Sequence, residues 1–487
     1  MRLCFVIPCL LGALHFACAC GRDPLTGDDA ESGFSGEGTS SGVGSEEGEP
    51  EPEPEPEPLF EPCDGDPRAA GLAISPVQRP LGYALPSGPT VAVEDTPGLL
   101  VALGGGTRDI VLVAGDYLPT PEVEQGVELF GHRLWSETLG GARVHFGLRA
   151  TTTGDDGAEL HGLRITPDTA LYGAAAATEA GGVGHYAVYA SGGGGAGFVV
   201  QDTWIDGQHE LDGGLRFDNP SGLRISRVEL RRFNQSGIEV GNPAAQLGSG
   251  ESNFPAPELS ELLIDEIGWF ASERPESVPL SAQCAMRIRD DASVSQVRIR
   301  EVGYKGIEIG GRVEWMELDG IDIDGVLGQQ SGDSWEGSAA VSLAENSRNV
   351  SLQHFCVGSN SRIGVNGQWY GEPIPSLHAV RPVISHGLID SQRFGVHFDA
   401  GSVAAQVFDL RVENYSRAGI VFFQNLATEA DLDTSPIDPL DPDPPNPAAA
   451  WQADASQTWD IEFAPACPGV PALSYAHWNS HPICGGD

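Results

Sequence analysis

The chain of 487 residues has few basic side chains and a single lysine, Lys305. Lys and Arg together number 27, against 69 Asp and Glu, so the formal net charge is −42. A protein of that charge repels phosphate groups, which disfavours nucleic acids and anionic lipid headgroups as binding partners. We therefore expect no nucleic acid partner.

Long apolar runs are also missing, apart from one at the N-terminus. Residues 3–19 are almost all apolar or small and follow a single Arg. The run is too short and wrongly flanked for a membrane span, so residues 1–20 are predicted to be a secretory signal. Alanines stand at positions −1 and −3 relative to Cys20, which resembles the cleavage box of bacterial lipoproteins. We expect Cys20 to be lipidated, which would anchor the exported protein to a membrane at the cell surface or periplasmic face. Ordinary cleavage and secretion is the alternative.

Two segments have a composition that disfavours a packed core. Residues 21–66 hold fifteen acidic residues and one basic residue, with a strict Glu-Pro alternation over residues 49–58. Proline and mutually repelling carboxylates predict an extended, disordered tether. Residues 426–450 are predicted to be an acidic, Pro-rich linker for the same reason. The folded body is then expected over residues 67–425, followed by a C-terminal tail at 451–487.

Cysteine is sparse outside the signal and is consistent with export. Five cysteines remain after the signal: Cys63, Cys284, Cys356, Cys467 and Cys484. Cys467 and Cys484 bracket the tail and are predicted to form a local disulfide. An odd number implies at least one thiol that is free or paired outside the chain. No Cys-x-x-Cys or His-x-x-x-His spacing points to zinc.

One pattern recurs from about residue 185 onward: a small residue, an apolar residue, a variable residue and a second apolar residue. The uninterrupted intervals between copies are about 22–24 residues, and Gly/Pro/Ser-rich inserts lengthen the others. A period of this length indicates a repeat protein. The variable residues of the eight copies are Arg216, Glu239, Arg287, Glu308, Ser342, Gly364, His397 and Val421.

Short stretches with an alternating apolar pattern lie between the copies, so each repeat carries about three short strands and no helical pattern. Such a unit cannot bury its own apolar face, but stacked on its neighbours at about 4.8 Å per rung it can. The repeat therefore predicts an all-β fold, a single-stranded parallel β-helix with long loop inserts. Its core should stack Leu215, Ile238, Met286 and Ile307 on one another.

The pattern resembles the right-handed parallel β-helix, or pectin-lyase-like, superfamily. The N-terminal end is similar to that family's entry, with residues 95–102 as a short capping helix and residues 109–117 as the first strand and turn. The resemblance covers residues 85–425 and implies about ten rungs. It implies no single function, because the superfamily includes lyases, hydrolases, isomerases and non-catalytic adhesins.

The variable residues should form a column on the outside of the stack. Arg216, Glu239, Arg287 and Glu308 alternate in charge over four successive repeats. One interpretation is a structural salt-bridge ladder that keeps like charges apart. The other is a catalytic or sugar-binding column, in which the two Glu carboxylates would lie about 10 Å apart on alternate rungs. Both interpretations stay open at this point.

Long inserts leave and enter the first strand of the repeat and carry many of the chain's aromatic residues. Aromatic rings beside polar groups suit stacking on sugar rings, although the rings would also pack their own loops onto the barrel. His397, an outward residue in the column, is expected to be exposed. The candidate ligand-binding residues are Trp269, Trp335, Trp369, Tyr370 and His397.

Four further features concern cofactors, a lysine, a short motif and the oligomeric state. No cofactor is required, and the metal content is unknown, but Asp290-Asp291 would suit calcium, which prefers several oxygen ligands. Lys305 is expected to be an exposed surface lysine. Residues 204–207, Trp-Ile-Asp-Gly, are similar to the Trp-Ile-Asp-His element of pectate lyases, but Gly207 stands in place of the histidine. We expect a monomer.

Two functions fit these sequence features. The first is an exported, lipid-anchored surface protein that binds a glycan or partner along its first-strand face. The alternative is a polysaccharide lyase or glycoside hydrolase that acts in a groove there, with Arg216, Glu239, Arg287 and Glu308 as its catalytic residues. The absence of the family's catalytic motifs favours the first, whereas the inserts along that face favour the second.

Overall fold

The computed structural model describes residues 83–123, 126–151, 157–168, 186–191, 196–218, 220–241, 255–268, 283–310, 313–326, 338–344, 347–368, 379–398, 405–422 and 457–474. All of them belong to one compact unit, Pro58–Asp487, which is separate from the unit Met1–Glu57. The predicted signal, the tether and the residue Cys20 lie outside the described residues. In the described part of the chain, no helix is long and apolar enough to cross a membrane.

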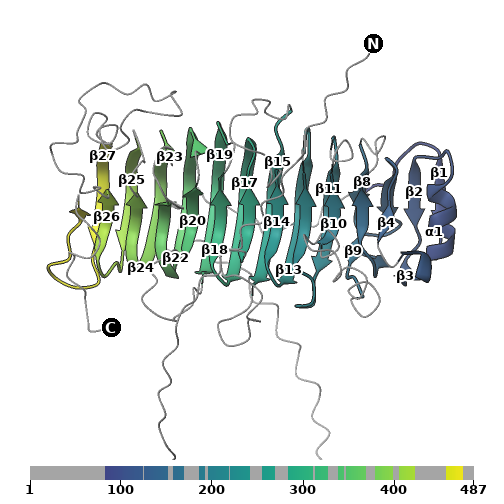
Figure 1. The fold of residues 1–487 in the computed structure, drawn as a ribbon, viewed down its shortest axis with the longest axis horizontal. Coiled ribbons are helices and arrows are strands. Elements are labelled where there is room, and N and C mark those ends of the chain that lie inside the picture. The colour runs from purple at the N-terminus through teal and green to yellow at the C-terminus, as the bar shows by residue number, and fades with distance from the viewer. Residues whose placement is uncertain are drawn as a thin grey trace, which may run out of the picture. The chain divides into compact units, whose positions relative to one another are not determined.

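The described residues form a ladder of parallel strands in which each strand pairs with its equivalent in the next repeat (Figure 1). This is the right-handed parallel β-helix that the repeat and the resemblance predicted. Each full repeat contributes one short strand and one long, bent strand, so that three sheets run along the stack. We call them the first, second and third sheets.

The first sheet carries the strands that contain the repeated sequence pattern. It is built from β4 (Val127–Glu128), β7 (Leu148–Ala150), β10 (Tyr186–Ala190), β12 (Gly213–Phe217), β14 (Ser236–Val240), β16 (Cys284–Ile288), β18 (Lys305–Ile309), β20 (Ala339–Ala344), the ends of β22 (Val350–Gln368) and β24 (Val383–Phe398), β26 (Ala418–Phe422) and β28 (Leu473–Ser474).

The second and third sheets are made by the remaining strands. Short strands begin the second sheet, namely β1 (Thr90–Val93), β2 (Asp109–Leu112), β5 (Arg133–Ser136) and β8 (Glu159–His161), and others begin the third, namely β3 (Gly115–Tyr117), β6 (Ala142–Val144) and β9 (Arg164–Ile165). The long strands then supply both sheets: β11 (Val199–Asp206), β13 (Arg224–Phe233), β15 (Glu258–Ile267), β17 (Ala292–Val302), β19 (Met316–Val326), the first parts of β22 and β24, β25 (Gln406–Glu413) and β27 (Gln457–Ala464). A separate pair is β21 (Ser347–Arg348) with β23 (Ala379–Val380).

Single residues in the left-handed region make the corner between the second and third sheets. Arg227, for example, has φ 52° and stands between the paired residues Ser226 and Val228 of β13. Such backbone is strained for non-glycine residues, so the stacking of neighbouring rungs must hold it in place. The same corner recurs at Asp202, Glu261, Gln296, Gly320, His354, His386, Asp409 and Asp460.

The small residue that opens each repeat has a steric cause. A Cβ on Gly306 would lie 2.5 Å from the carbonyl oxygen of Ala340 in the next rung, and one on Gly237 would lie 2.7 Å from that of Ala285. The chain therefore enters the first sheet at a point where neighbouring backbones leave almost no room. Inside the stack the predicted column Leu215, Ile238, Met286 and Ile307 is confirmed, since these residues pair in register and all four are fully buried.

A helix caps the N-terminal end of the stack, and a further strand extends its C-terminal end. Helix α1 (Thr96–Leu103) lies at the N-terminal end, where the Asp95 side chain accepts a hydrogen bond from the Gly98 amide at 2.8 Å. This confirms the expected capping helix, although β1 precedes it and pairs with β2. The 3-10 turn η2 (Pro121–Val123) follows β3. At the other end β27 pairs with β25, so the ladder continues beyond residue 425, where the predicted body ended.

A charge placed in the apolar stack should prevent folding. We expect Ile307→Asp to lower the free energy of unfolding by more than about 4 kcal/mol, because an unpaired carboxylate would enter a closed apolar column. The matched control is Val101→Asp on α1, where the side chain is 78 % exposed. Thermal unfolding followed by circular dichroism compares the two. An Ile307→Asp protein that melts like the control would contradict the core described above.

Candidate functional site

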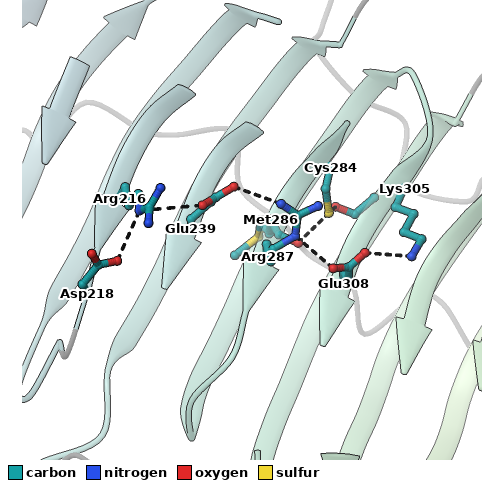
Figure 2. Close-up of polar contacts among 9 residues, drawn as sticks. Arg216, Asp218, Glu239, Cys284, Met286, Arg287, Lys305 and Glu308 are labelled. Atoms are coloured by element: carbon teal, nitrogen blue, oxygen red, sulfur yellow. Dashed lines mark hydrogen bonds and ion pairs between the residues drawn. The ribbon is translucent and has the colours of Figure 1, made fainter. Parts of the chain in front are cut away.

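Four charged side chains of alternating sign lie in one row on the outer face of the first sheet (Figure 2). Arg216 of β12 pairs in register with Glu239 of β14, Glu239 with Arg287 of β16, and Arg287 with Glu308 of β18. The predicted column is therefore present over these four rungs. Because equivalent residues of a parallel stack are direct neighbours, the fold itself brings these charges together.

The contacts along the row are short and continuous. The Arg287 guanidinium donates to Glu239 Oε1 at 3.0 Å and to Glu308 Oε1 at 2.9 Å. Arg216 Nε lies 4.0 Å from Glu239 Oε2. The side chains of Arg287 and Glu239 are each 11 % exposed, so these ion pairs are largely removed from water. Such pairs interact strongly, but each charge also loses hydration when it is buried.

The only lysine of the chain extends this row, contrary to the expectation that it would be exposed. Lys305 is fully buried, and its Nζ lies 2.7 Å from Glu308 Oε2. Strict strand alternation would place Lys305 on the same face as Ile307. Gly306 has no partner in the register between β16 and β18, however, and Lys305 reaches the face of Glu308 (Figure 2). We call Arg216, Glu239, Arg287, Glu308 and Lys305 the charged row.

Two tyrosines on the rung before Arg216, and an aspartate just after its own strand, continue the site. Its guanidinium carbon lies 5.5 Å from the ring centroid of Tyr186 and 5.9 Å from that of Tyr189. Asp218 accepts hydrogen bonds from Arg216 Nε at 3.2 Å and from the Tyr189 hydroxyl at 3.0 Å. The repeat pattern did not point to these residues, although Tyr189 pairs in register with Arg216 and so occupies the same column.

The column differs from the expectation on the C-terminal side. Ser342 pairs in register with Asn366, so Asn366 takes the place that was assigned to Gly364. His397 follows on the next rung, where Nδ1 lies 3.1 Å from Asn366 Oδ1. His397 is only 2 % exposed, which corrects the expectation of simple exposure. A polar column therefore continues from the charged row to His397.

Burial and charge shift the pKa values of several groups in this site in different directions. Burial alone would raise the pKa of Glu308, but Lys305 and Arg287 outweigh it and hold the pKa below its ordinary value. Burial, with Glu239 adding to it, raises the pKa of the Tyr186 hydroxyl well above its ordinary value. Desolvation would lower the pKa of Arg287, yet the nearby carboxylates raise it. Near neutral pH the site thus holds ionised Glu308 and a protonated phenol.

A buried thiol lies beside the charged row. Cys284 is a free cysteine with no exposed surface, and its Sγ donates to the Met286 carbonyl oxygen at 2.9 Å. Burial raises the pKa of this thiol to about 12, so it is not a nucleophile near neutral pH. Cys356 and Cys467 are disulfide-bonded. Cys484 lies outside the described residues, so the pairing of Cys467 with Cys484 stays a prediction.

The remaining predicted ligand groups are not assembled by the described residues. Trp269, Trp335, Trp369 and Tyr370 lie outside them. Within the described ranges, no group of three or more His, Cys, Asp or Glu side chains is placed to hold a metal ion. Asp291 Oδ1 accepts hydrogen bonds from the amides of Glu314 at 2.7 Å and Trp315 at 2.9 Å. Calcium binding therefore stays a prediction without a defined site.

Loss of Lys305 should weaken the fold and flatten its response to acid. Lys305→Met removes one partner of a buried pair, and we expect the free energy of unfolding to fall by about 3 kcal/mol. The pKa of Glu308 is lower in the folded protein than its ordinary value of 4.5. The ionised side chain therefore stabilises the fold above about pH 4.5, and this stabilisation is lost as the pH falls. Without Lys305 the pKa of Glu308 is lowered less. The free energy of unfolding of the variant should therefore fall less between about pH 6 and pH 3 than that of the wild type.

The control for this experiment is Arg143→Met. Arg143 pairs with Asp116 at 3.5 Å at an exposed position, so its loss should cost no more than about 0.5 kcal/mol. Urea titrations at several pH values measure both variants. An equal, small effect of the two substitutions would show that the charged row does not contribute to the fold in this way.

Solved structures resemble this chain only weakly. No protein-family model matches the sequence, and no curated protein matches it. A solved catalytic domain of a GH87 α-1,3-glucanase in complex with nigerose aligns at 11 % identity over 80 % of this chain and 67 % of that one, with a TM-score of 0.41. An alginate lyase from Paenibacillus sp. aligns at 9 % identity over 80 % and 98 % of the two chains, with a TM-score of 0.37.

A third solved structure is the A-module of the mannuronan C-5 epimerase from Azotobacter vinelandii. It aligns at 11 % identity over 79 % of this chain and 92 % of that one, with a TM-score of 0.36. At such identities and TM-scores these alignments carry no argument about this chain, whose fold is established by the register of its own strands.

Proposed function

We propose that this chain binds a polysaccharide along the outer face of its first sheet. The observation that supports this best is the buried charged row on the outside of the β-helix. Glu239 and Arg287 are buried, and Lys305 has no exposed surface. Apolar residues at such positions are often as stabilising as buried ion pairs or more so, so an outer row of charges suggests a role other than stability.

The chemistry of the site suits a linear sugar polymer. From Tyr189 on β10 to His397 on β24 the polar column covers seven rung steps of about 4.8 Å, or roughly 34 Å. Arg guanidinium groups bind sugar carboxylates in a bidentate manner, carboxylates accept hydrogen bonds from sugar hydroxyls, and tyrosine rings supply flat apolar surface. The paired cations of the row would also let an acidic chain accept an acidic polymer.

Turnover of the polysaccharide is the second candidate, and one observation favours it. Tyr186 keeps its proton, since burial raises its pKa, whereas the pKa of Glu308 is lowered. Tyr186 on β10 and Glu308 on β18 are four rungs of about 4.8 Å apart, so they do not form an acid and base pair on one sugar bond, and Tyr186 alone would supply the acid. A lyase would use a protonated phenol as acid, while a hydrolase would need a carboxylic acid of raised pKa. Glu308 does not fit that second role, so we place lyase chemistry ahead of hydrolysis.

The location of the protein is part of the proposal. An exported chain with lipid on Cys20 and a long acidic tether would hold the β-helix away from the membrane surface. That arrangement suits a protein that meets polymers outside the cell. Metabolic labelling with a fatty acid, with Cys20→Ser as the comparison, tests the anchor.

Binding and turnover can be separated with two variants. Glu239→Gln and Arg287→Met should each weaken binding of an acidic polysaccharide such as alginate by about tenfold or more, because each removes a charged hydrogen-bonding group. Affinity gel electrophoresis on alginate, pectate and α-1,3-glucan measures binding. Absorbance at 235 nm and reducing-sugar release, with and without calcium, measure turnover. Arg143→Gln is the exposed control.

Two outcomes decide between the interpretations of the row. Each substitution also breaks a buried ion pair and should lower the melting temperature, so binding is measured well below that temperature. Lost binding by a variant that is still folded would support the site. Unchanged binding with a lower melting temperature would leave only the structural role of the ion pairs. Production of unsaturated ends by the wild type, and its loss in Tyr186→Phe, would establish the lyase.

A further inference from the structure

A polar hollow lies on the outer face of the third sheet, away from the charged row. Its volume is about 260 Å³, and it opens over β9, β11 and β13. The residues that line it and carry its chemistry are Arg164, Trp204, Asp206, Glu229 and Arg231. The hollow is smaller than a typical drug-sized pocket and has room for about one sugar ring.

Three successive rungs supply a cation, an aromatic ring and a carboxylate at equivalent positions. Arg164 pairs in register with Trp204, and Trp204 pairs with Glu229. The Arg164 guanidinium carbon lies 5.6 Å from the centroid of the Trp204 ring. Gly140 faces both side chains: a Cβ there would lie 3.2 Å from Arg164 Nε and 3.2 Å from the Trp204 ring. The backbone at Gly140 thus leaves space for this arrangement.

The carboxylates of the hollow are already neutralised, whereas one cation is not. Glu229 pairs with Arg231, and Asp206 pairs with Arg232. Arg143, on the rung before Arg164, pairs with Asp116. Among the residues that the structure describes, no carboxylate pairs with Arg164. This is unusual in a chain whose formal net charge is −42, and it leaves a positive charge at the edge of the hollow.

The departure from the Trp-Ile-Asp-His element has a local explanation here. Ile205 is buried, while Trp204 and Asp206 line the hollow. A Cβ on Gly207 would lie 2.4 Å from the Phe233 ring and 2.6 Å from the Arg232 carbonyl oxygen, so no larger residue fits. The segment therefore cannot present a histidine at this position, and its outward residues serve the hollow instead.

We propose that this hollow binds one acidic sugar residue, a uronate. The sugar ring stacks on Trp204, its carboxylate pairs with Arg164, and its hydroxyls donate to the carboxylates of Glu229 and Asp206. The site lies on a different sheet from the charged row and does not depend on the function proposed for that row. It would give the protein a second point of contact with an acidic polymer, which raises avidity without new contacts at the first.

Titration with glucuronate and with glucose, followed by saturation-transfer NMR on the full-length protein, tests the proposal. The wild type should bind glucuronate at least about tenfold more tightly than glucose, and Arg164→Gln should lose about tenfold in affinity for glucuronate. Arg164 is exposed, so this substitution should leave the melting temperature unchanged. Trp204→Leu should weaken the binding of both sugars.

The control is Arg143→Gln, which changes a neighbouring cation outside the hollow. This variant should bind glucuronate within about twofold of the wild type. The proposal is wrong if Arg164→Gln binds as the wild type does, if glucose binds as well as glucuronate, or if Arg143→Gln loses as much affinity as Arg164→Gln.

Discussion

Equivalent residues of successive repeats stack in register, one rung of about 4.8 Å above another, and this stacking sets the surroundings of each side chain. Every side chain has as its nearest neighbours the side chains at the same position in the repeats before and after it. Apolar positions therefore become closed columns, such as the one that contains Met286 and Ile307. Charged positions become rows in which like charges repel at close range, and in the charged row the sign alternates.

In the charged row, stacking buries charged groups and also places groups of different protonation state on one face. Arg287 lies between two carboxylates and Glu308 lies between two cations, so no charge in this stretch is left without a partner. Burial of such groups costs hydration, and their mutual attraction offsets that cost only while every partner is present. The same arrangement keeps Glu308 ionised and leaves the Tyr186 hydroxyl protonated, which places groups of different protonation on one face.

A β-helix offers more than one outer face, and the two polar sites use different ones. The charged row lies on the first sheet and consists of groups that are paired with one another. The hollow at Trp204 lies on the third sheet and contains a cation that no described carboxylate pairs with. In the charged row, neighbouring rungs carry charges of opposite sign that pair with one another. In the hollow, three neighbouring rungs carry a cation, an aromatic ring and a carboxylate. Together they suit contact with an extended ligand at more than one point.

The repeat was enough to predict the β-helix, the stacked core and the alternation of four charges, because spacing along the sequence becomes register in space. It failed where local backbone geometry breaks the simple pattern. Gly364 is the small opening residue of its copy, and Gly367 fills the last apolar position. Because Gly367 is not apolar, the sequence pattern assigned the variable position of this repeat to Gly364 instead of Asn366.

The full membership of the charged site depends on how the folded chain orients each side chain. Lys305 was expected in water, but the unpaired Gly306 turns it toward Glu308, and burial makes it part of the ion-pair network. Tyr186 and Tyr189 lie over Arg216 because of their place on β10, which the repeat pattern did not mark. Sequence spacing thus determined which positions are neighbours along the stack. Bends of the backbone at single residues decide which face of the sheet a side chain lies on and how deeply it is buried. The spacing of the repeats does not contain that information.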